Sequence, residues 1–382
     1  MLLSRRSTSV LRGNKIIFLD YEQLLATYDY SLDPSLIAAE PLAERDHSRL
    51  LIYDREKGQI DHRHFFSLPD HLHSTDLLIL NDSRVFPARL RARKESARKE
   101  LARKELGGSI DLLLLRPSVD GMTWEVLVKG KAGVSSRLHL TGGGIGQVIR
   151  EGEGGWKEIR FDIPTEYPNM ISYLDRWGET PLPPYILKRR SGAERPGEPL
   201  ERERYQTVYA RVSGSVAAPT AGLHFTDSLL ETIRRKGVAV ATVTLHVGLG
   251  TFQPMRDERI DNHRMHREWF RIPEETAEAV RAARRRGGRV IAVGTTVTRA
   301  LESVSSPDGT VKAGEGETDL FIRPGYRFNV VDGLVTNFHL PKSTLLVLVS
   351  AFAGGEAIRS VYREAIRERY RFYSYGDAML LL

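Results

Sequence analysis

Five histidines in the second half of the chain lie in short polar stretches that are bracketed by apolar residues. They are His224, His246, His263, His266 and His339. Imidazole changes its protonation state near neutral pH more readily than other side chains, and polar groups enclosed by apolar sequence are poor core material unless they are hydrogen-bonded. We therefore interpret residues 204–377 as an active-site half, and the chain as an enzyme.

Two of these stretches have the composition of ligand-binding turns. Residues 218–226 contain Thr220 and lead into a predicted helix, whose free N–H groups favour a carboxylate or phosphate. Residues 244–252 end a predicted strand, and Gly248 and Gly250 allow the backbone to approach a ligand closely. A capped turn and a tight turn, respectively, are the alternatives, because the glycine spacing is not that of a dinucleotide motif.

His263 and His266 are three residues apart and share a face if their segment is helical. That spacing could bind a metal, but no third ligand follows nearby, so we predict no metal site. Proton transfer or hydrogen bonding to a substrate is the favoured interpretation, and a structural pair of histidines is the alternative.

Further polar groups follow other predicted strands. Thr295 begins a predicted helix directly after a strand, and Glu317 and Asp319 supply carboxylates. Lys342 lies close to His339, before an apolar helix. Ligands of α/β proteins gather where strands end at their carboxyl edge, so this repetition predicts one shared pocket. The chain has no Ser-His-Asp order, Walker loop or dinucleotide fingerprint.

The elements that position these groups alternate between helix and strand. Capping residues and apolar periodicity predict helices over residues 226–236, 273–286 and 356–370, with strands over residues 238–247 and 289–293. Such alternation indicates a parallel or mixed sheet with covered faces, or a barrel.

The first half of the chain has a pattern of short predicted strands instead. Strands are predicted over residues 48–54 and 75–80, and short strands separated by glycine-rich turns follow between residues 110 and 161. Short strands at this spacing predict a small β-barrel or sandwich.

We therefore predict an α/β fold with a β/α barrel-like large domain and an inserted small β-barrel domain. The large domain takes residues 20–90 and 165–382, and the insertion takes residues 91–164. Within the insertion, residues 92–106 repeat Ala-Arg-Lys-Glu, which predicts a solvated helix or a mobile segment, with an RNA-contacting arm as the alternative. Residues 1–19 are a basic extension, for which we expect disorder.

Composition narrows the class of protein. The absence of cysteine excludes disulfides and thiolate chemistry. No apolar run approaches the roughly 20 residues that cross a bilayer, which makes a cytoplasmic protein the default. The net charge of +7 is compatible with an RNA partner but is a weak signal.

The chain resembles the S-adenosylmethionine:tRNA ribosyltransferase-isomerase family of queuosine biosynthesis. The resemblance extends over residues 28–380, and its strongest segments include residues 81–90, 215–226, 244–252 and 369–379. It implies transfer and isomerisation of the ribosyl moiety of S-adenosylmethionine onto 7-aminomethyl-7-deazaguanine at the wobble position of tRNA. The implied products are epoxyqueuosine-tRNA, adenine and methionine.

The resemblance also implies roles for the motifs. The five histidines become acid/base candidates, and Asp319 or Glu317 becomes a partner for the sulfonium charge. Substrate-binding candidates are Asp82 and Arg84 for the modified base, Thr220 and Lys342 for the methionine carboxylate, and Gly248, Gly250 and Thr295 nearby. The expected partners are a tRNA anticodon stem-loop and S-adenosylmethionine, which is consumed, so no cofactor is expected. We expect a monomer without an obligate protein partner.

The chain departs from the family pattern in its basic extension, its Ala-Arg-Lys-Glu repeat and the pair Val297-Thr298. Two rival interpretations remain at this stage. One is a related nucleoside-processing enzyme that acts on a free base. The other is a non-catalytic RNA-binding protein, against which the density of polar motifs at strand ends argues.

Overall fold

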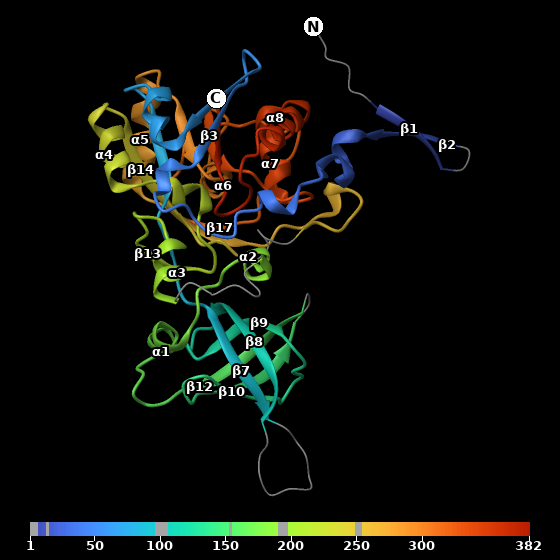
Figure 1. The fold of residues 1–382 in the computed structure, drawn as a ribbon, viewed down its shortest axis with the longest axis vertical. Helices are drawn as coiled ribbons and strands as arrows, with labels where there is room; N and C mark the ends of the chain where they lie inside the picture. Colours follow the sequence, from blue (N-terminus) through green and yellow to red (C-terminus); the bar gives the residue numbers. More distant parts are fainter. Residues whose placement is uncertain (1–6, 13–14, 96–105, 153–154, 190–197, 249–253) are drawn as a thin grey trace, which may run out of the picture.

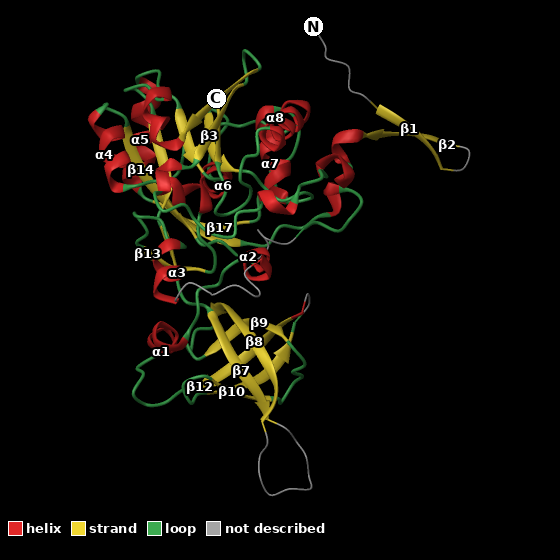
Figure 2. Cartoon of the chain, in the orientation of Figure 1, coloured by secondary structure: helices red, strands yellow, loops and turns green. Residues whose placement is uncertain are grey.

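The structure is a computed structural model that describes residues 7–12, 15–95, 106–152, 155–189, 198–248 and 254–382. Figure 1 shows a large part that contains most helices and, below it, a separate small barrel. Colouring by secondary structure separates the two parts equally clearly, because the barrel is almost entirely strand (Figure 2).

The small part is a closed antiparallel barrel in which the strands follow the order β10-β11-β12-β9-β8-β7. The strands are β7 (Arg89–Glu95), β8 (Leu106–Pro117), β9 (Thr123–Lys129), β10 (Arg137–Leu140), β11 (Ile145–Glu151) and β12 (Trp156–Asp162). Alternate residues such as Leu112, Leu114 and Val126 point inward and fill the barrel with apolar side chains.

The large part is built on a nine-stranded mixed sheet of order β17-β15-β14-β5-β16-β18-β19-β3-β4. Its strands are β3 (Arg49–Asp54), β4 (Gln59–His64), β5 (Leu77–Asn81), β14 (Ala239–Leu245), β15 (Glu268–Ile272), β16 (Val290–Val293), β17 (Gly314–Thr318), β18 (Gly333–Asn337) and β19 (Ala378–Leu381). The predicted α/β fold with an inserted small β-barrel is confirmed.

Helices cover both faces of this sheet (Figure 1). Those that pack on the sheet are α4 (Asp227–Arg235), α5 (Glu274–Arg285), α6 (Thr295–Ser303), α7 (Thr344–Ala353) and α8 (Gly355–Arg367). Helix α1 (Met170–Trp177) packs against the small barrel instead, and α2 (Pro184–Arg189) and α3 (Glu198–Arg204) are two short helices that follow it. Short 3-10 helices occupy Tyr21–Gln23, Leu25–Tyr28, Pro34–Leu36, Arg45–His47, Phe65–His71, Thr220–His224 and Ile260–Asn262. The expected helices appear as α4, α5 and α8, and the Thr226 hydroxyl accepts the Leu229 N–H to begin α4.

Strand β5 shows why the sheet needs cover on both faces. Leu77 and Ile79 pack into one apolar cluster, whereas Leu78 and Leu80 pack into another on the opposite face. A strand buried on both sides reads as a continuous apolar run. The four consecutive aliphatic residues of β5 therefore belong at the centre of a three-layer structure.

Strands β14, β5, β16 and β18 run parallel to one another, so their carboxyl ends meet at one edge of the sheet. Strand β19 is antiparallel to β18, and β3 is parallel to β19, so both begin at that same edge. We call it the carboxyl edge. A two-stranded parallel pair, β6 (Ser83–Val85) with β13 (Val212–Ser215), lies beyond it.

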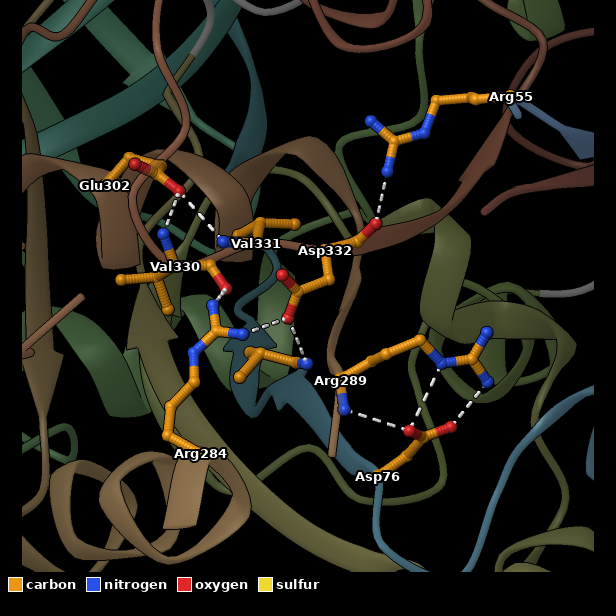
Figure 3. A network of polar contacts seen from close by, with 9 residues as sticks. Arg55, Asp76, Arg284, Arg289, Glu302, Val330, Val331 and Asp332 are labelled. Atoms are coloured by element: carbon orange, nitrogen blue, oxygen red, sulfur yellow. Dashed lines mark hydrogen bonds and ion pairs between the residues drawn. The ribbon is translucent and has the colours of Figure 1, made fainter. Parts of the chain in front are cut away.

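The opposite edge is held by paired charges (Figure 3). The buried Asp76, just before β5, accepts two hydrogen bonds from the Arg289 guanidinium, the shorter at 2.6 Å. Asp332, just before β18, accepts one from Arg284 at 2.7 Å. Glu302 of α6 accepts backbone N–H groups that precede β18. These carboxylates satisfy backbone and arginine donors where the parallel strands begin.

Two regions differ from expectation. Ala92 to Glu95 belong to β7 and Leu106 begins β8, so the helix predicted for the repeat is wrong in its described part. Ala92 pairs with both Ile110 and Leu140, and this closure of the barrel outweighs helix propensity. The rest of the repeat, residues 96–105, lies outside the described residues.

Where disorder was expected at the amino terminus, β1 (Ser7–Arg12) and β2 (Lys15–Asp20) form an antiparallel hairpin. Across the described chain, no single helix has the length and apolar character needed to cross a membrane. Only α7 and α8 taken together, bent by 112° at their junction, reach that length and composition.

Candidate functional site

A cavity of about 660 Å³ lies between the small barrel and the large sheet. On the barrel side it is lined by residues of β8, β9 and β12, among them Arg116, Glu125 and Trp156. On the sheet side it is lined by Gly214, Val216, His246, Val247, Gly248, His266, Arg267, Glu268, Trp269 and Glu317. Two domains meeting at a strand-end edge are a common place for a ligand site.

His246 directly follows β14 and is the more enclosed of the two histidines that line this cavity, since it is partly buried and His266 is exposed. Its N–H donates to the Trp269 carbonyl at 3.0 Å, and its ring stacks on the Trp269 indole with centroids 4.9 Å apart. Its Nδ1 is buried and has no hydrogen-bond partner among the described residues. Burial lowers the pKa of His246, an effect that Asp82 opposes. The imidazole is therefore neutral at pH 7 and able to accept a proton.

Gly214 makes room for the His246 ring. It lies at the irregularity in the β6–β13 pairing with a φ of +144°, a conformation that L side chains rarely adopt. A Cβ added there would lie 2.5 Å from His246 Nε2. Glycine is thus required at this bulge both by the backbone and by the imidazole.

A buried ion pair forms one wall of the cavity. Glu268 Oε2 pairs with Arg299 Nη1, and both side chains are about 5% exposed or less. The other carboxylate oxygen accepts the Gly248 N–H at 2.8 Å, and Arg299 Nε donates to the Leu320 carbonyl at 3.0 Å. The pair thereby joins β15, α6 and the segment after β17 to the start of the glycine-rich turn.

Glu317 is the carboxylate that links the two walls. Its Oε1 accepts a hydrogen bond from Arg116 of the barrel at 3.2 Å, and its Oε2 lies 3.9 Å from Arg267. Asp319 is largely exposed and lies 3.7 Å from Arg267. Glu317 therefore lines the cavity, whereas Asp319 is not among its lining residues.

Asp82 lies at the carboxyl edge, directly after β5. It is buried, accepts the Thr244 hydroxyl at 2.6 Å and pairs with Arg211 at 2.9 Å. The neighbouring Asn81 side chain bonds the backbone of Leu245 in both directions. Arg84, two residues further on, is exposed in β6.

His224 and His339 lie at the same edge but are enclosed by protein groups. His224 Nδ1 lies 2.7 Å from the Ser48 hydroxyl, and Nε2 lies 3.3 Å from Asn337 Oδ1. Burial lowers the pKa of His224 to about 4 and that of His339 to about 3. His339 Nε2 bonds the Thr336 hydroxyl at 2.8 Å. Neither ring lines the interdomain cavity.

The His263–His266 segment is not helical, so the two imidazoles do not share a helix face. His266 lines the cavity, whereas His263 packs against Phe321 with ring centroids 5.6 Å apart. Burial and the neighbouring His266 lower the pKa of His263. Among the described residues, the grouping with three potential metal ligands is Glu44, Asp46 and His47, away from this pair.

Of the other predicted substrate-binding residues, Thr220, Thr295 and Lys342 do not line this cavity. Thr220 begins a 3-10 helix and Thr295 begins α6, where it is buried. Lys342 is half-exposed and forms an ion pair with Asp29 at 2.7 Å. Gly248 lines the cavity, and Gly250 lies outside the described residues.

Several residues of the cavity were not selected from the sequence. Glu268 and Trp269 follow His266 by two and three residues, and Arg299, the ion-pair partner of Glu268, directly follows Val297-Thr298. Their local signal was present, but only the fold shows that they meet. Arg116 and Trp156 come from the barrel strands, whose sequence carries no comparable polar motif.

The fold and the cavity define a two-domain α/β enzyme with its candidate site between a small barrel and the carboxyl edge of a mixed sheet. Residues 25–381 match the family described as "Queuosine biosynthesis protein". The chain belongs to this family.

Named relatives agree with that placement. The chain is 50% identical over 364 residues to the S-adenosylmethionine:tRNA ribosyltransferase-isomerase of Geobacter sulfurreducens, covering 94% of this chain and 99% of the relative. It is 48% identical to the protein of the same name from Moorella thermoacetica, over 93% and 98% of the two chains. The crystal structure of an S-adenosylmethionine tRNA ribosyltransferase from Thermotoga maritima is similar at 36% identity and a TM-score of 0.50, covering 93% of this chain and all of that one.

Proposed function

We propose that this chain transfers and isomerises the ribosyl moiety of S-adenosylmethionine onto 7-aminomethyl-7-deazaguanine at the wobble position of tRNA. Epoxyqueuosine-tRNA, adenine and methionine are the products. The observation that carries the proposal is the near-full-length similarity to enzymes named for this reaction. Because those names specify tRNA as the acceptor, the alternative that a free base is the acceptor is not favoured.

The interdomain cavity is the proposed place of reaction. The reaction needs a base for the acidified proton next to the sulfonium and an acid for adenine departure. We assign proton exchange to His246, which is neutral at pH 7 and has an unbonded Nδ1, with His266 as a second candidate on the same cavity. The acid and base need not be the same residue.

The carboxylates of the cavity receive different roles because their hydrogen-bond and ion-pair partners differ. Glu268 is neutralised by Arg299 and bonded to Gly248, so we assign it to positioning. Glu317 also faces two arginines, Arg116 at 3.2 Å and Arg267 at 3.9 Å, but its side chain is 39% exposed and lines the cavity, where a carboxylate would stabilise the sulfonium cation. Asp82 lies at the same edge and is a candidate for recognition of the modified base.

His224 and His339 receive positioning roles in this proposal, because both ring nitrogens of His224 and Nε2 of His339 are already engaged within the protein. We further propose that the acceptor is the anticodon stem-loop, that S-adenosylmethionine is consumed as donor without a further cofactor, and that a monomer suffices. We also propose a cytoplasmic location.

The proposal is tested with purified protein, S-adenosylmethionine and tRNA that carries the aminomethyl-deazaguanine base. Adenine and methionine release are measured by chromatography, and the RNA product is measured by mass spectrometry. We expect stoichiometric adenine release that requires the modified tRNA. Equal release with the free base alone would instead support the alternative acceptor.

A further inference from the structure

Outside the interdomain cavity, three arginines converge on a second hollow near the carboxyl edge. Arg45, Arg204 and Arg371, here called the arginine cluster, line it together with His224 and Tyr375. They come from three distant segments: the start of a 3-10 helix, the end of α3 and the turn before β19.

Among the described residues no carboxylate forms a direct ion pair with the cluster, although Glu203 acts electrostatically on Arg45, and Asp377 and Glu40 act on Arg371. All hydrogen-bond acceptors of these guanidinium groups in the described chain are backbone carbonyls. They belong to Gln206, Leu223 and Glu203 for Arg45, to Leu42 and Ala43 for Arg204, and to Glu40 for Arg371. Burial and the neighbouring Arg204 lower the pKa of Arg45, as expected for like charges held together.

Arg371 supplies the second, independent observation. Its Nη1 is enclosed and has no acceptor among the described residues, although its Nη2 bonds the Glu40 carbonyl. Leaving a buried guanidinium N–H without an acceptor is costly, and such groups in native proteins usually have a water or a bound ion as partner. Arg371 lines a hollow of about 20 Å³, which has room for one small group, so this nitrogen meets an acceptor there once its side chain turns toward the hollow.

The adjoining surface indicates which anion fits. A wider hollow of about 240 Å³ shares Arg204 and Tyr375 with the first one, and it is also lined by Glu40 and Glu201. Two carboxylates beside the cluster would repel a phosphodiester, but they complement an ammonium group. The two hollows together therefore match a zwitterion that carries a carboxylate and an ammonium on neighbouring atoms.

We propose that the arginine cluster binds the α-carboxylate of an amino-acid group, with its ammonium toward Glu40 and Glu201. This inference rests on the proposed function, in which that group is the methionyl end of S-adenosylmethionine and, after reaction, free methionine. Guanidinium groups bind carboxylates through strong, charge-assisted hydrogen bonds. The assignment replaces Thr220 and Lys342, whose side chains do not line either hollow.

The cluster is connected to the strand-end residues of the reaction site. Arg45 donates to the Gln206 carbonyl, and the Gln206 side chain bonds the backbone of Val85 at both N–H and carbonyl. Val85 ends β6, the strand that follows Asp82. An amino-acid group bound here would anchor S-adenosylmethionine at the part of the carboxyl edge where β3 and β19 begin.

The test compares Arg371→Met with Arg371→Lys and with Arg55→Met as a matched control. Arg55 also donates to two backbone carbonyls, but it is exposed and lies at the opposite edge, beside Asp332 (Figure 3). Binding of S-adenosylmethionine and of methionine is measured by titration calorimetry on the full chain. Binding of modified tRNA is measured at several salt concentrations.

We expect Arg371→Met to weaken S-adenosylmethionine and methionine binding by about tenfold to a hundredfold, the effect of one charge-assisted hydrogen bond. Arg371→Lys should recover part of the lost affinity, and Arg55→Met should change the affinity for both ligands by less than about twofold. Affinity for tRNA and its salt dependence should not change. Thermal unfolding of the three variants shows whether they fold alike.

Three outcomes would overturn the inference. In the first, Arg371→Met is folded and binds S-adenosylmethionine as tightly as an active wild-type protein does. The enclosed nitrogen then binds only water, and the proposed function stays intact. Weaker tRNA binding with a smaller salt slope means that a phosphate is bound instead. Wild-type protein that binds neither S-adenosylmethionine nor methionine would refute the proposed function as well.

Discussion

Replacing Gly214 by alanine tests whether the position of His246 controls turnover. The added Cβ would lie 2.5 Å from His246 Nε2, where ordinary contacts begin at 3.4 Å. The ring must therefore move by about 0.9 Å, or the bulge must shift by a similar amount, and a displacement of about 1 Å at a reacting group costs on the order of 100-fold in rate. We expect kcat of Gly214→Ala to fall by about that factor.

Backbone strain is a separate consequence of the same substitution, and it has a matched control. Gly314 has a φ of +141°, close to the +144° of Gly214, but a Cβ there would meet nothing within 4 Å. Each alanine should cost on the order of 1–3 kcal/mol of unfolding free energy from the strained φ alone. Only Gly214→Ala should also displace an imidazole.

The assay follows adenine release at saturating S-adenosylmethionine and modified tRNA, with chemical unfolding of both variants in parallel. We expect Gly314→Ala to retain wild-type kcat within about threefold, since a surface substitution away from the site perturbs little else. A Gly214→Ala protein that is folded, destabilised like the control and equally active would refute the assigned role of His246.

Four further predictions follow from the described geometry. Because burial lowers the pKa of His246 from 6.5, the acid limb of kcat/KM should lie below pH 6.5, and a limb above that value would argue against its acting as base. Glu268→Gln leaves Arg299 buried without its charge partner and should lower the unfolding free energy by about 3–5 kcal/mol. Denaturant titration measures this loss, and a loss below about 1 kcal/mol would contradict the buried ion pair. Burial alone would raise the pKa of Asp76, but its hydrogen bonds from Arg289 and from the backbone lower that pKa overall. The stabilisation that Asp76 contributes is therefore complete above its unfolded pKa of about 3.9 and is lost as pH falls through its folded pKa. The unfolding free energy should fall more steeply below pH 4 in the wild type than in Asp76→Asn. His339→Ala should destabilise the fold by on the order of 2–4 kcal/mol through the cavity and lost hydrogen bond, and an inactive variant with unchanged stability would restore His339 as a catalytic candidate.

Local features of this protein could be predicted from the sequence because their causes lie within a few residues. The Thr226 cap, the glycines after α4 and α5, and the aliphatic run of β5 each specify an element by propensity and periodicity. Turn spacing likewise indicated the inserted barrel. The polar motifs at strand ends indicated an active site, because polar groups in apolar surroundings need a reason to be there.

Which of these groups meet was decided by the tertiary structure. Strand order places Asp82 and His246 at one edge although 163 intervening residues separate them along the chain. The same packing encloses His224 and His339, and it gathers three arginines that no motif connected. Such contacts depend on long-range strand pairing and on the burial it creates, which local periodicity does not encode. The sequence by itself therefore determined the elements and the chemical groups, whereas the fold determined which of them share a cavity and which are held in the core.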